Sequence, residues 1–547
     1  MLHTTRSLLL AMGVLLTTTV RPQCTETAQN KVLLVGDSWA FFMGVDQTIN
    51  EVLAKWGHSG YRYYTNLTLA ENGAETDDFL GMDKQAEIAD RLLNNPGIKV
   101  VHLSIGGNDV LGDWNVSFTP EQTDSLRQAV FDRLQQVITF ILGVRPDIHV
   151  LWSGYMYPNF EEVIEDLAPL QTIHPFYGTW QDMGFPTFIQ LNTILNDFSA
   201  LLEGYADTTD RVSFVSATGL MQHAFGQNTT LGVPPGGSYP PSTAPLPFGF
   251  VDYPSPKSSM RNYGLTRDCF HLSASGYREM VELHARKFYH KFLMDDQYLI
   301  SSGSQDGSVS SQGAVSSTLQ LGTAGTEQFA TVLTFATTDM QQAIVDGASI
   351  FLRRTGLTGD DPLSSTLQVK VKSGAFGTAF ELEAVDYFAS PDASGSACRF
   401  GSNGGNGHWI RLDLPTELLP YLSQTAATQF ILSAPGFTQG VMTFNDASDP
   451  ELAPVLNLRF GELVTATGPV PNDERHEVFP NPTDGPLHLN VTGEQVLDVQ
   501  VFDLLGQLVL HRHAPGALVD LSALPAGQYL IHLRTTSGSS VQRVARW

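Results

Sequence analysis

The sequence predicts an α/β domain with a parallel sheet, followed by two β-rich regions. Residues 29–299 alternate short apolar runs with amphipathic segments, which is typical of a parallel sheet covered by helices. Beyond residue 317 the apolar runs are short, alternate with polar residues and are separated by turn residues, which indicates antiparallel strands. We therefore expect a three-layer α/β/α domain, then a β-sandwich and a small C-terminal β-sandwich.

Particular runs within residues 29–299 predict particular elements. The run VLLV is bounded by a glycine and predicts a buried strand, and VVHLS predicts a second one. The apolar spacing of SLRQAVFDRLQQVITFIL is helical, IHVLWSGY predicts a further strand, and the last segment predicts a closing helix. These five runs lie at residues 32–35, 100–104, 125–142, 148–155 and 271–293.

The N-terminal segment 1–28 is built like a signal peptide. A short basic start precedes an apolar stretch of about fourteen residues, which is too short to span a bilayer. We expect cleavage between Val20 and Ala28, export of the remaining chain, and no transmembrane segment.

Composition shifts mark the other boundaries. The α/β domain is expected over 29–299, and a Ser/Gly-rich stretch at 300–317 is expected to be a flexible linker. A β-sandwich accessory module is expected over 318–462, a second linker over 463–477, and a small β domain over 478–547.

Charge and cysteine content narrow the function classes. The formal net charge of −25 comes from 56 acidic and 31 basic residues and would repel phosphate backbones, so no nucleic acid partner is expected. The 15 histidines are scattered without a metal-ligand spacing such as HExxH, so neither a metal nor another cofactor is expected. Cleavage at or beyond Cys24 would leave Cys269 and Cys398 in different domains, so a disulfide framework is not implied.

A serine and an acid–histidine pair are the first chemical signal. Ser38 follows the strand run at 32–35, and the reactive centre of an open α/β sheet lies past the carboxyl ends of its strands. A serine hydroxyl needs a base within hydrogen-bond reach, and His271 is the candidate. Asp268 lies three positions before His271, on one helical turn or tight loop, and is suited to orient its imidazole. This set of residue types predicts nucleophilic acyl transfer.

The second chemical signal is a set of groups that can stabilise an oxyanion. The strand run at 100–104 ends in Gly106-Gly107-Asn108-Asp109, and the amide of Asn108 can donate a hydrogen bond without carrying a charge. Gly73 lies in a polar turn whose N–H is a second donor, and the N–H of Ser38 is a third. Four residues next to these groups are expected to contact substrate: Asp37, Trp39, Gly107 and Asp109.

These four blocks resemble those of the SGNH/GDSL hydrolase family. GDS stands at 36–38, a glycine at 73, GGND at 106–109 and DxxH at 268–271, in the family's order, although Trp39 replaces the leucine of GDSL. The resemblance implies a flavodoxin-like hydrolase domain with Ser38 as nucleophile and His271 and Asp268 completing the triad. It implies an oxyanion hole made by Ser38, Gly73 and Asn108, and an ester as substrate.

Two further resemblances concern the β-rich regions. The runs LTF, ASIFL and DPELAPVLNLRF are similar to those of DNRLRE-type jelly-roll modules of bacterial surface proteins. The runs VFPNPTDGPLHLNV, VQVFDLLGQLVL and LPAGQYLIHL resemble the C-terminal sorting domain of the type IX secretion system of Bacteroidota. The second resemblance implies the type IX machinery as a partner and a place outside the cell, either released or on the outer-membrane surface.

Three functional alternatives remain open. An exported hydrolase with an accessory module favours acyl or acetyl esters of carbohydrates, whereas an apolar lid would favour lysophospholipids or other lipid esters. A non-catalytic polysaccharide-binding surface protein is the third. The Pro- and aromatic-rich half of segment 156–265, which carries Tyr239, Phe248, Phe250 and Tyr253, is a candidate lid.

Overall fold

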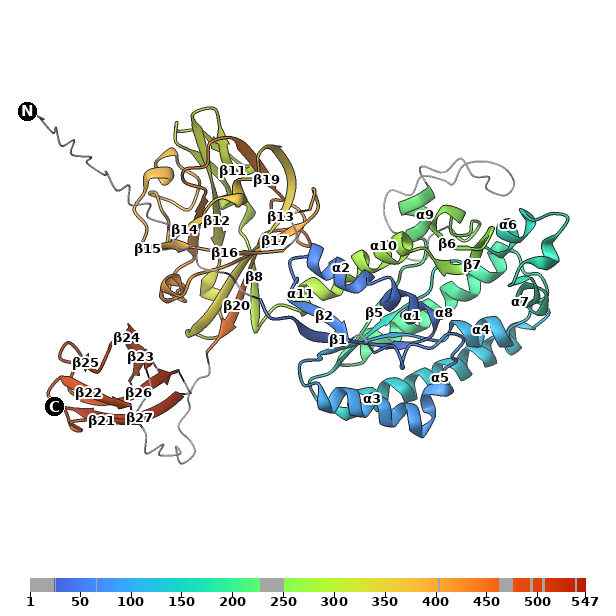
Figure 1. Ribbon diagram of the computed structural model, residues 1–547, viewed down its shortest axis with the longest axis horizontal. Coiled ribbons are helices and arrows are strands. Elements are labelled where there is room, and N and C mark those ends of the chain that lie inside the picture. Colours follow the sequence, from blue (N-terminus) through green and yellow to red (C-terminus); the bar gives the residue numbers. More distant parts are fainter. Residues whose placement is uncertain are drawn as a thin grey trace, which may run out of the picture.

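The computed structural model describes Cys24 and residues 26–64, 66–226, 250–401, 404–461, 476–491, 495–503, 507–536 and 539–547. Figure 1 shows three parts in chain order, namely an α/β region, a β-rich region and a small C-terminal β region. Most of the predicted signal peptide, residues 1–23 and 25, lies outside the described residues.

The α/β region is built on a five-stranded parallel sheet in the order β2-β1-β3-β4-β5. This is the flavodoxin-like order, in which the sheet reverses direction of growth between β1 and β3. The predicted α/β region with a parallel sheet is therefore confirmed. Its strands are β1 (Gln29–Gly36), β2 (Tyr61–Tyr64), β3 (Val100–Ser104), β4 (His149–Ser153) and β5 (Val212–Val215).

Helices cover both faces of this sheet (Figure 1). Alternate residues of β1 point to opposite faces, because side chains of a strand alternate. Val32 and Leu34 belong to the core under α1, α2 and α10, whereas Leu33 and Val35 belong to the core under α3, α5 and α8. These helices are α1 (Ser38–Val45), α2 (Thr48–Lys55), α3 (Met82–Asn94), α5 (Pro120–Val144), α8 (Phe188–Thr208) and α10 (Ala274–His284).

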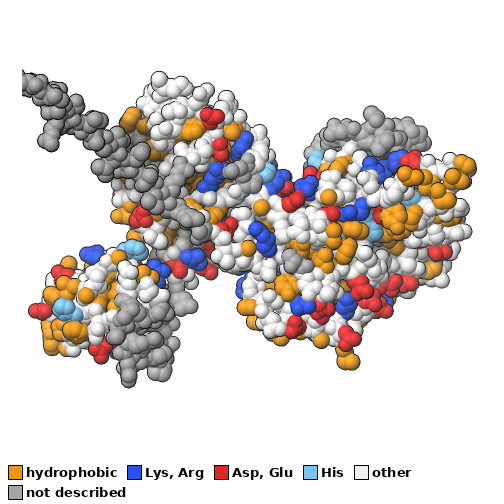
Figure 2. Space-filling view, in the orientation of Figure 1, with side chains coloured by type: hydrophobic (Ala, Val, Ile, Leu, Met, Phe, Trp, Pro, Cys, Tyr) orange, Lys and Arg blue, Asp and Glu red, His pale blue; other side chains and the backbone are white. Residues whose placement is uncertain are grey.

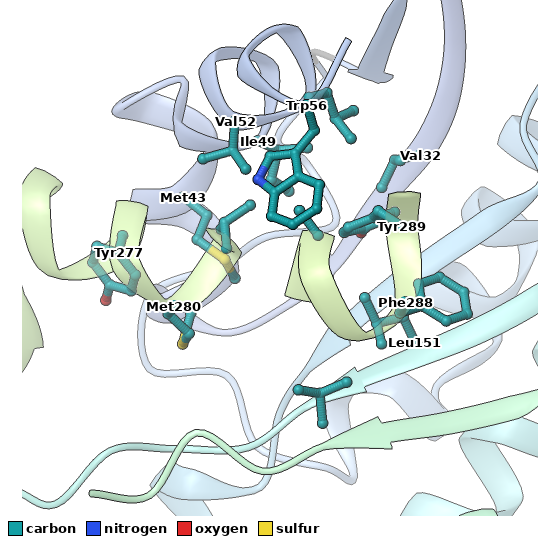
Figure 3. Close-up of a cluster of buried hydrophobic side chains, with 14 of the residues drawn as sticks. Val32, Met43, Ile49, Val52, Trp56, Leu151, Tyr277, Met280, Phe288 and Tyr289 are labelled. Carbon is teal, nitrogen blue, oxygen red and sulfur yellow. The ribbon is translucent and has the colours of Figure 1, made fainter. Parts of the chain in front are cut away.

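The first of these cores is shown in Figure 3, where Trp56 lies among apolar side chains of α1, α2 and α10. Met43 and Val52 approach it from the first two helices, and Met280 from α10. Leu151 of β4 closes the cluster on the side of the sheet.

The chain leaves β1 through a glycine that no other residue can replace without a backbone shift. Gly36 has φ +146°, and a Cβ built there would lie 1.8 Å from the carbonyl oxygen of Ser104 in β3. The close approach of β1 and β3 therefore requires glycine at this position. Asp37 is the N-cap of helix α1, so the strand and the helix meet at residues 36–38.

The closing segment differs from the single helix predicted over 271–293. His271 belongs to strand β7 (Thr266–Leu272), which pairs with β6 (Met260–Tyr263), and α10 begins only after the N-cap Ser273. A π-helical turn over Ala285–Tyr289 then connects α10 to α11 (His290–Phe292). The apolar periodicity of the segment is helical from residue 274 onward, but pairing with β6 extends residues 266–272.

The β-rich region forms an antiparallel sheet of 13 strands among the described residues. Its longest strand, β13 (Val345–Gly359), pairs with β20 and β17 through its first half and with β19 through its second half. The antiparallel prediction is confirmed, and β13 connects its partner strands into one sheet. The other strands are β8 (Gln297–Ile300), β9 (Gly307–Ser310), β10 (Val315–Ser316), β11 (Leu319–Ala324), β12 (Glu327–Phe335), β14 (Gln368–Ser373), β15 (Ala393–Ser396), β16 (Cys398–Phe400), β17 (Trp409–Asp413), β18 (Thr428–Ser433), β19 (Gly440–Phe444) and β20 (Val455–Phe460).

The stretch 300–317, predicted to be a flexible linker, is instead part of this sheet. β9 pairs with β10 and β12, and its four residues are buried. The hydroxyl of Ser310 accepts hydrogen bonds from the N–H groups of Gln312 and Ala314, which closes the turn between β9 and β10. The small polar residues here allow close pairing of strands. The boundary of the α/β region lies earlier than predicted, at about residue 296, because β8 pairs with β20.

The α/β and β-rich regions share one apolar core. Trp409, which is fully buried, stacks on Trp56 with ring centroids 5.5 Å apart. His290 packs against Trp409 at 4.1 Å, and Phe351 and Val455 belong to the same cluster. The two regions are therefore packed as one body.

The N-terminal residues of the described chain join this body. Cys24 forms a disulfide with Cys398 at the start of β16, and Glu26 makes an ion pair with Arg411 at 2.6 Å. The sequence analysis did not foresee this bond, because it took Cys24 as removed by cleavage. Cleavage before Cys24, within the predicted range from Val20 to Ala28, would keep this bond, whereas cleavage at residue 28 would remove one half of it.

The C-terminal region consists of two small antiparallel sheets, β21-β22-β25 and β24-β23-β26-β27. Alternate residues of these strands form a separate core that includes Leu487, Val499 and Ile531. The region begins with β21 at His476, two residues before the predicted start, and most of the predicted linker 463–477 lies outside the described residues. The strands are β21 (His476–Phe479), β22 (Pro486–Val491), β23 (Val496–Phe502), β24 (Leu508–His513), β25 (Leu518–Asp520), β26 (Gly527–Thr535) and β27 (Ser539–Arg546).

Candidate active site

Ser38 is the first residue of helix α1, at the carboxyl end of β1. The side chain of Asp37 caps this helix by accepting a hydrogen bond from the N–H of Trp39 at 2.9 Å. The N–H of Ser38 lies in the first helical turn, where no intrahelical acceptor exists. It therefore remains available to a negatively charged atom in front of the helix.

The hydroxyl of Ser38 faces the imidazole of His271, with 2.7 Å between Oγ and Nε2. On the other side of the ring, Nδ1 lies 2.9 Å from Oδ2 of Asp268. All three side chains are at least nine-tenths buried. The structure thus brings together the three residues that the sequence analysis predicted to act as nucleophile, base and orienting acid, although 230 residues of chain separate Ser38 from Asp268 (38 to 268).

Asp268 is held by hydrogen bonds from the backbone of the residues that follow it. Its Oδ1 accepts hydrogen bonds from the N–H groups of Phe270 and His271, at 2.9 and 2.8 Å. These bonds leave Oδ2 directed to the imidazole of His271. The pair therefore lies on a short Asx-type turn at the end of β7, and not on a helical turn.

Aromatic rings surround the imidazole of His271. The centroid of Phe42 lies 5.0 Å from it, that of Phe176 6.2 Å and that of Phe270 4.2 Å. Phe42 is covered in turn by the guanidinium of Arg261 at 4.0 Å. These contacts restrict the ring to the orientation that faces Ser38.

Asn108 lies at the second position of α4 (Gly107–Asp113), after the sharp turn at Gly106 with φ +114°. Its Nδ2 donates a hydrogen bond to the carbonyl of Ala74 at 2.8 Å, and the second hydrogen of the amide remains. The turn that carries Ala74 includes Gly73, which has φ +80°. Through this hydrogen bond, the side chain of Asn108 lies against the turn that contains Gly73.

The turn at residues 70–76 is fixed between β1 and α4. The carbonyl of Gly36 accepts from the N–H of Glu71 at 2.9 Å, which ties the turn to the strand before Ser38. The carboxylate of Asp109 accepts from the N–H of Thr76 at 3.0 Å and from Arg133 at 2.8 Å. Asp109 is fully buried in these contacts and does not line the cavity beside Ser38. It therefore positions the turn and does not contact substrate, as the sequence analysis had expected it to do.

The other three predicted substrate contacts, Asp37, Trp39 and Gly107, line that cavity. The hydroxyl of Tyr155 donates to Oδ2 of Asp37 at 2.5 Å, and its ring meets Trp39 edge-on with centroids 5.1 Å apart. Burial raises the pKa of Asp37 to about 7 against these hydrogen bonds. The sequence analysis missed Tyr155, although its place just after β4 is a signal, because the carboxyl ends of parallel strands share one edge of the sheet.

Other predicted features fall outside this arrangement. Cys269 is buried and its Sγ lies 3.8 Å from Nδ1 of His174, and burial raises the pKa of its thiol. Tyr239 and Phe248 of the candidate lid lie outside the described residues, whereas the carbonyls of Phe250 and Tyr253 accept from Gln222.

The described residues contain neither a candidate metal site nor a candidate membrane-spanning helix. No group of three or more His, Cys, Asp or Glu side chains in the described part of the chain is arranged to hold a metal ion. Likewise, none of the described helices has the length and apolar content needed to cross a bilayer.

A comparison with protein families identifies the C-terminal region. Residues 477–545 match the family model of the secretion system C-terminal sorting domain. This match confirms the resemblance seen in the sequence and indicates export to the cell surface or the extracellular space. A search of curated proteins found no match to the chain.

A comparison with solved structures finds esterases and lipases that cover about half of this chain. A carbohydrate esterase family 3 structure from Talaromyces cellulolyticus is 13% identical, with a TM-score of 0.27, and covers 48% of this chain and 97% of its own. A family 3 carbohydrate esterase from Clostridium thermocellum is 16% identical, with a TM-score of 0.26, and covers 47% and 94%. A GDSL-like lipase from Bacteroides thetaiotaomicron is 12% identical, with a TM-score of 0.25, and covers 46% and 85%.

Proposed function

We propose that the chain is an exported serine ester hydrolase, which the type IX secretion machinery carries out of the cell by its C-terminal domain. The single observation that carries the catalytic part is the line of hydrogen bonds from Asp268 through His271 to Ser38. It ends at the carboxyl edge of a parallel sheet, where open α/β proteins bind their ligands.

The first half of the reaction forms an acyl-enzyme. Oγ of Ser38 attacks the ester carbonyl carbon while Nε2 of His271 accepts its proton. Asp268 holds the proton on Nδ1 and stabilises the imidazolium. The bond to the alcohol oxygen then breaks, and His271 transfers its proton to the departing alcohol.

The oxyanion formed in this step is stabilised by neutral donors. The N–H groups of Ser38 and Gly73 and the remaining amide hydrogen of Asn108 supply three candidate hydrogen bonds. Preorganised donors of this kind do not have to reorient as charge develops, which is why they lower the barrier. Asn108 owes its orientation to its hydrogen bond with Ala74.

The second half of the reaction regenerates Ser38. A water molecule attacks the acyl carbonyl while His271 accepts one of its protons, and the bond to Oγ of Ser38 breaks. The proton on His271 returns to Ser38, and the carboxylic acid leaves. The net reaction consumes one water and gives one acid and one alcohol.

Replacement of the nucleophile tests this proposal. Ser38→Ala should lower kcat for a p-nitrophenyl ester by at least roughly 10⁴-fold, because no attacking oxygen remains. The loss should appear in kcat without loss of folding, which circular dichroism and the thermal midpoint would check.

The matched control is Ser125→Ala, which removes an exposed serine hydroxyl of α5 far along the chain from the site. We expect its kinetics to equal those of the wild type. Full activity in Ser38→Ala would reject the assignment of the nucleophile, and an inactive wild type on all esters would leave the non-catalytic binding protein as the better interpretation.

A further inference from the structure

A cavity that is partly open to solvent, with a volume of about 30 Å³, lies beside Ser38. Its walls come from segments far apart in the sequence, namely α4, the loop after β4, helix α8 and strand β7. Apolar side chains dominate these walls, and they include Val110, Leu111, Met156, Leu191, Leu195 and Phe270. Because Leu191 and Leu195 are one helical turn apart, α8 supplies a continuous apolar wall.

The position of this cavity relative to the triad indicates which half of an ester it faces. Ser38 and Asn108 line it, whereas His271 does not. The departing alcohol has to lie near Nε2 of His271 to receive its proton, while the acyl carbon bonds to Ser38. A cavity on the side of Ser38 and Asn108 therefore faces the acyl half.

The polar groups at this cavity have partners already. Oδ2 of Asp37 accepts from Tyr155 at 2.5 Å, and Oδ1 accepts from the N–H of Trp39. The side-chain amide of Asn108 donates one hydrogen to the carbonyl of Ala74, and the other is assigned to the oxyanion in the proposed reaction. A hydroxylated group such as a sugar ring would leave its own hydroxyls without partners among these walls, and that is unfavourable.

On these grounds we propose that the cavity binds the acyl group, and that the group is a linear aliphatic chain longer than acetyl. The inference rests on the proposed esterase function and concerns the acyl half of the ester only. The wall from Leu191 to Leu195 is about 6 Å long, which suits butanoyl to hexanoyl chains. Each methylene moved from water to such a wall favours binding about fourfold.

Exposed apolar side chains lie near the end of the α/β region that contains the cavity. They agree with a substrate that carries an apolar chain. Figure 2 shows hydrophobic side chains on the surface at the end that carries α6 (Phe160–Glu165) and α7 (Tyr177–Asp182). Between these two helices in the sequence, Leu170 is 58% and Ile173 65% exposed.

The test compares kcat/KM of the full exported chain on p-nitrophenyl acetate, butyrate and hexanoate. For the wild type we expect values that increase from acetate to hexanoate by at least roughly tenfold, as methylenes fill the cavity. Leu195→Trp fills the cavity, so it should reduce the hexanoate-to-acetate ratio by at least roughly tenfold. Leu195 is only partly buried, which favours folding of this variant.

Thr193→Trp is the matched control, since it places the same ring on the exposed side of the same helix. Its hexanoate-to-acetate ratio should equal that of the wild type. If the wild type prefers acetate, or if Leu195→Trp changes all three esters equally, the acyl cavity is rejected and the esterase function stands. If the wild type hydrolyses none of the esters, the proposed function itself fails.

Discussion

Asn108 shows how one side chain can hold a loop and also face the reaction. One hydrogen of its amide donates to Ala74, which orients the group, and the other is free to meet an oxyanion. A backbone N–H cannot be removed by mutation, so Asn108 is the member of the proposed oxyanion hole that is open to a side-chain test.

Asn108→Ala should lower kcat on a p-nitrophenyl ester by roughly 10²–10³-fold, because one donor to the developing charge is lost. Steady-state kinetics would measure the change, with KM expected to move little. Asn94→Ala, at an exposed position of α3, is the control and should behave as the wild type. Activity of Asn108→Ala within a factor of about three of the wild type would remove Asn108 from the oxyanion hole.

Asp37 predicts a specific dependence of stability on pH. Burial raises its pKa from the ordinary 3.8 to about 7, so between these values the folded state binds a proton that the unfolded state has released. Stability must then fall as the pH rises through this window and level off above it. Asp37→Asn removes the titrating group but keeps the size of the side chain.

The thermal midpoints of both proteins between pH 4 and pH 8 would measure this dependence. We expect the wild type to lose stability relative to Asp37→Asn as the pH rises, with the difference constant above the folded pKa. Parallel curves over the whole range would show that Asp37 is ionised in the folded state, held so by Tyr155 and Trp39.

At the scale of the elements, the site depends on the junction of β1 with α1 and on the turn at residues 70–76. Gly36 brings β1 against β3, and the same glycine bonds to Glu71 of the turn. Asp109 fastens the other end of the turn through Thr76. The strand, the turn and α4 are thus held together by backbone and buried side-chain contacts, which the order of motifs along the chain did not reveal.

The stretch 300–317 shows why composition misled the prediction of a linker. Serine and glycine are frequent in flexible linkers, but they also fit where strands approach closely. Gly307 has a Cβ position only 2.2 Å from the carbonyl oxygen of Ser316, so the pairing of β9 and β10 requires glycine there. β9 also pairs with β12, and that strand lies further along the chain.

For the whole molecule, the packing of Trp409 on Trp56 joins the two large regions. Ion pairs between Arg286 and Asp449, at 2.8 Å, and between Lys287 and Glu451, at 2.6 Å, lie at the same interface. Exposed pairs of this kind add little stability, so the buried aromatic rings account for most of the attachment. The accessory region is therefore a fixed neighbour of the α/β region.

The disulfide between Cys24 and Cys398 connects the N-terminal residues to the β-rich region over 374 positions of sequence. Cys398→Ser should lower the free energy of unfolding by about 2–4 kcal/mol, because the long loop is no longer closed in the unfolded state. Denaturant unfolding of the exported protein, with the reduced wild type as reference, would measure this loss.

A thiol titration in denaturant provides the check on the bond itself. The exported wild type should show one free thiol, that of Cys269, and Cys398→Ser should show two. Two free thiols in the wild type, with no loss of stability in Cys398→Ser, would mean that cleavage removes Cys24.

The sequence by itself determined the class of the three regions and the residue types of the site. Local patterns carry this information, since periodicity and glycine positions depend on neighbours within a few residues. Tertiary structure decided the rest, namely that Ser38 lies 2.7 Å from His271, that Tyr155 holds Asp37, and that the Ser/Gly stretch is a pair of strands. Those facts depend on contacts between residues that are tens to hundreds of positions apart, and only the packed chain brings such residues together.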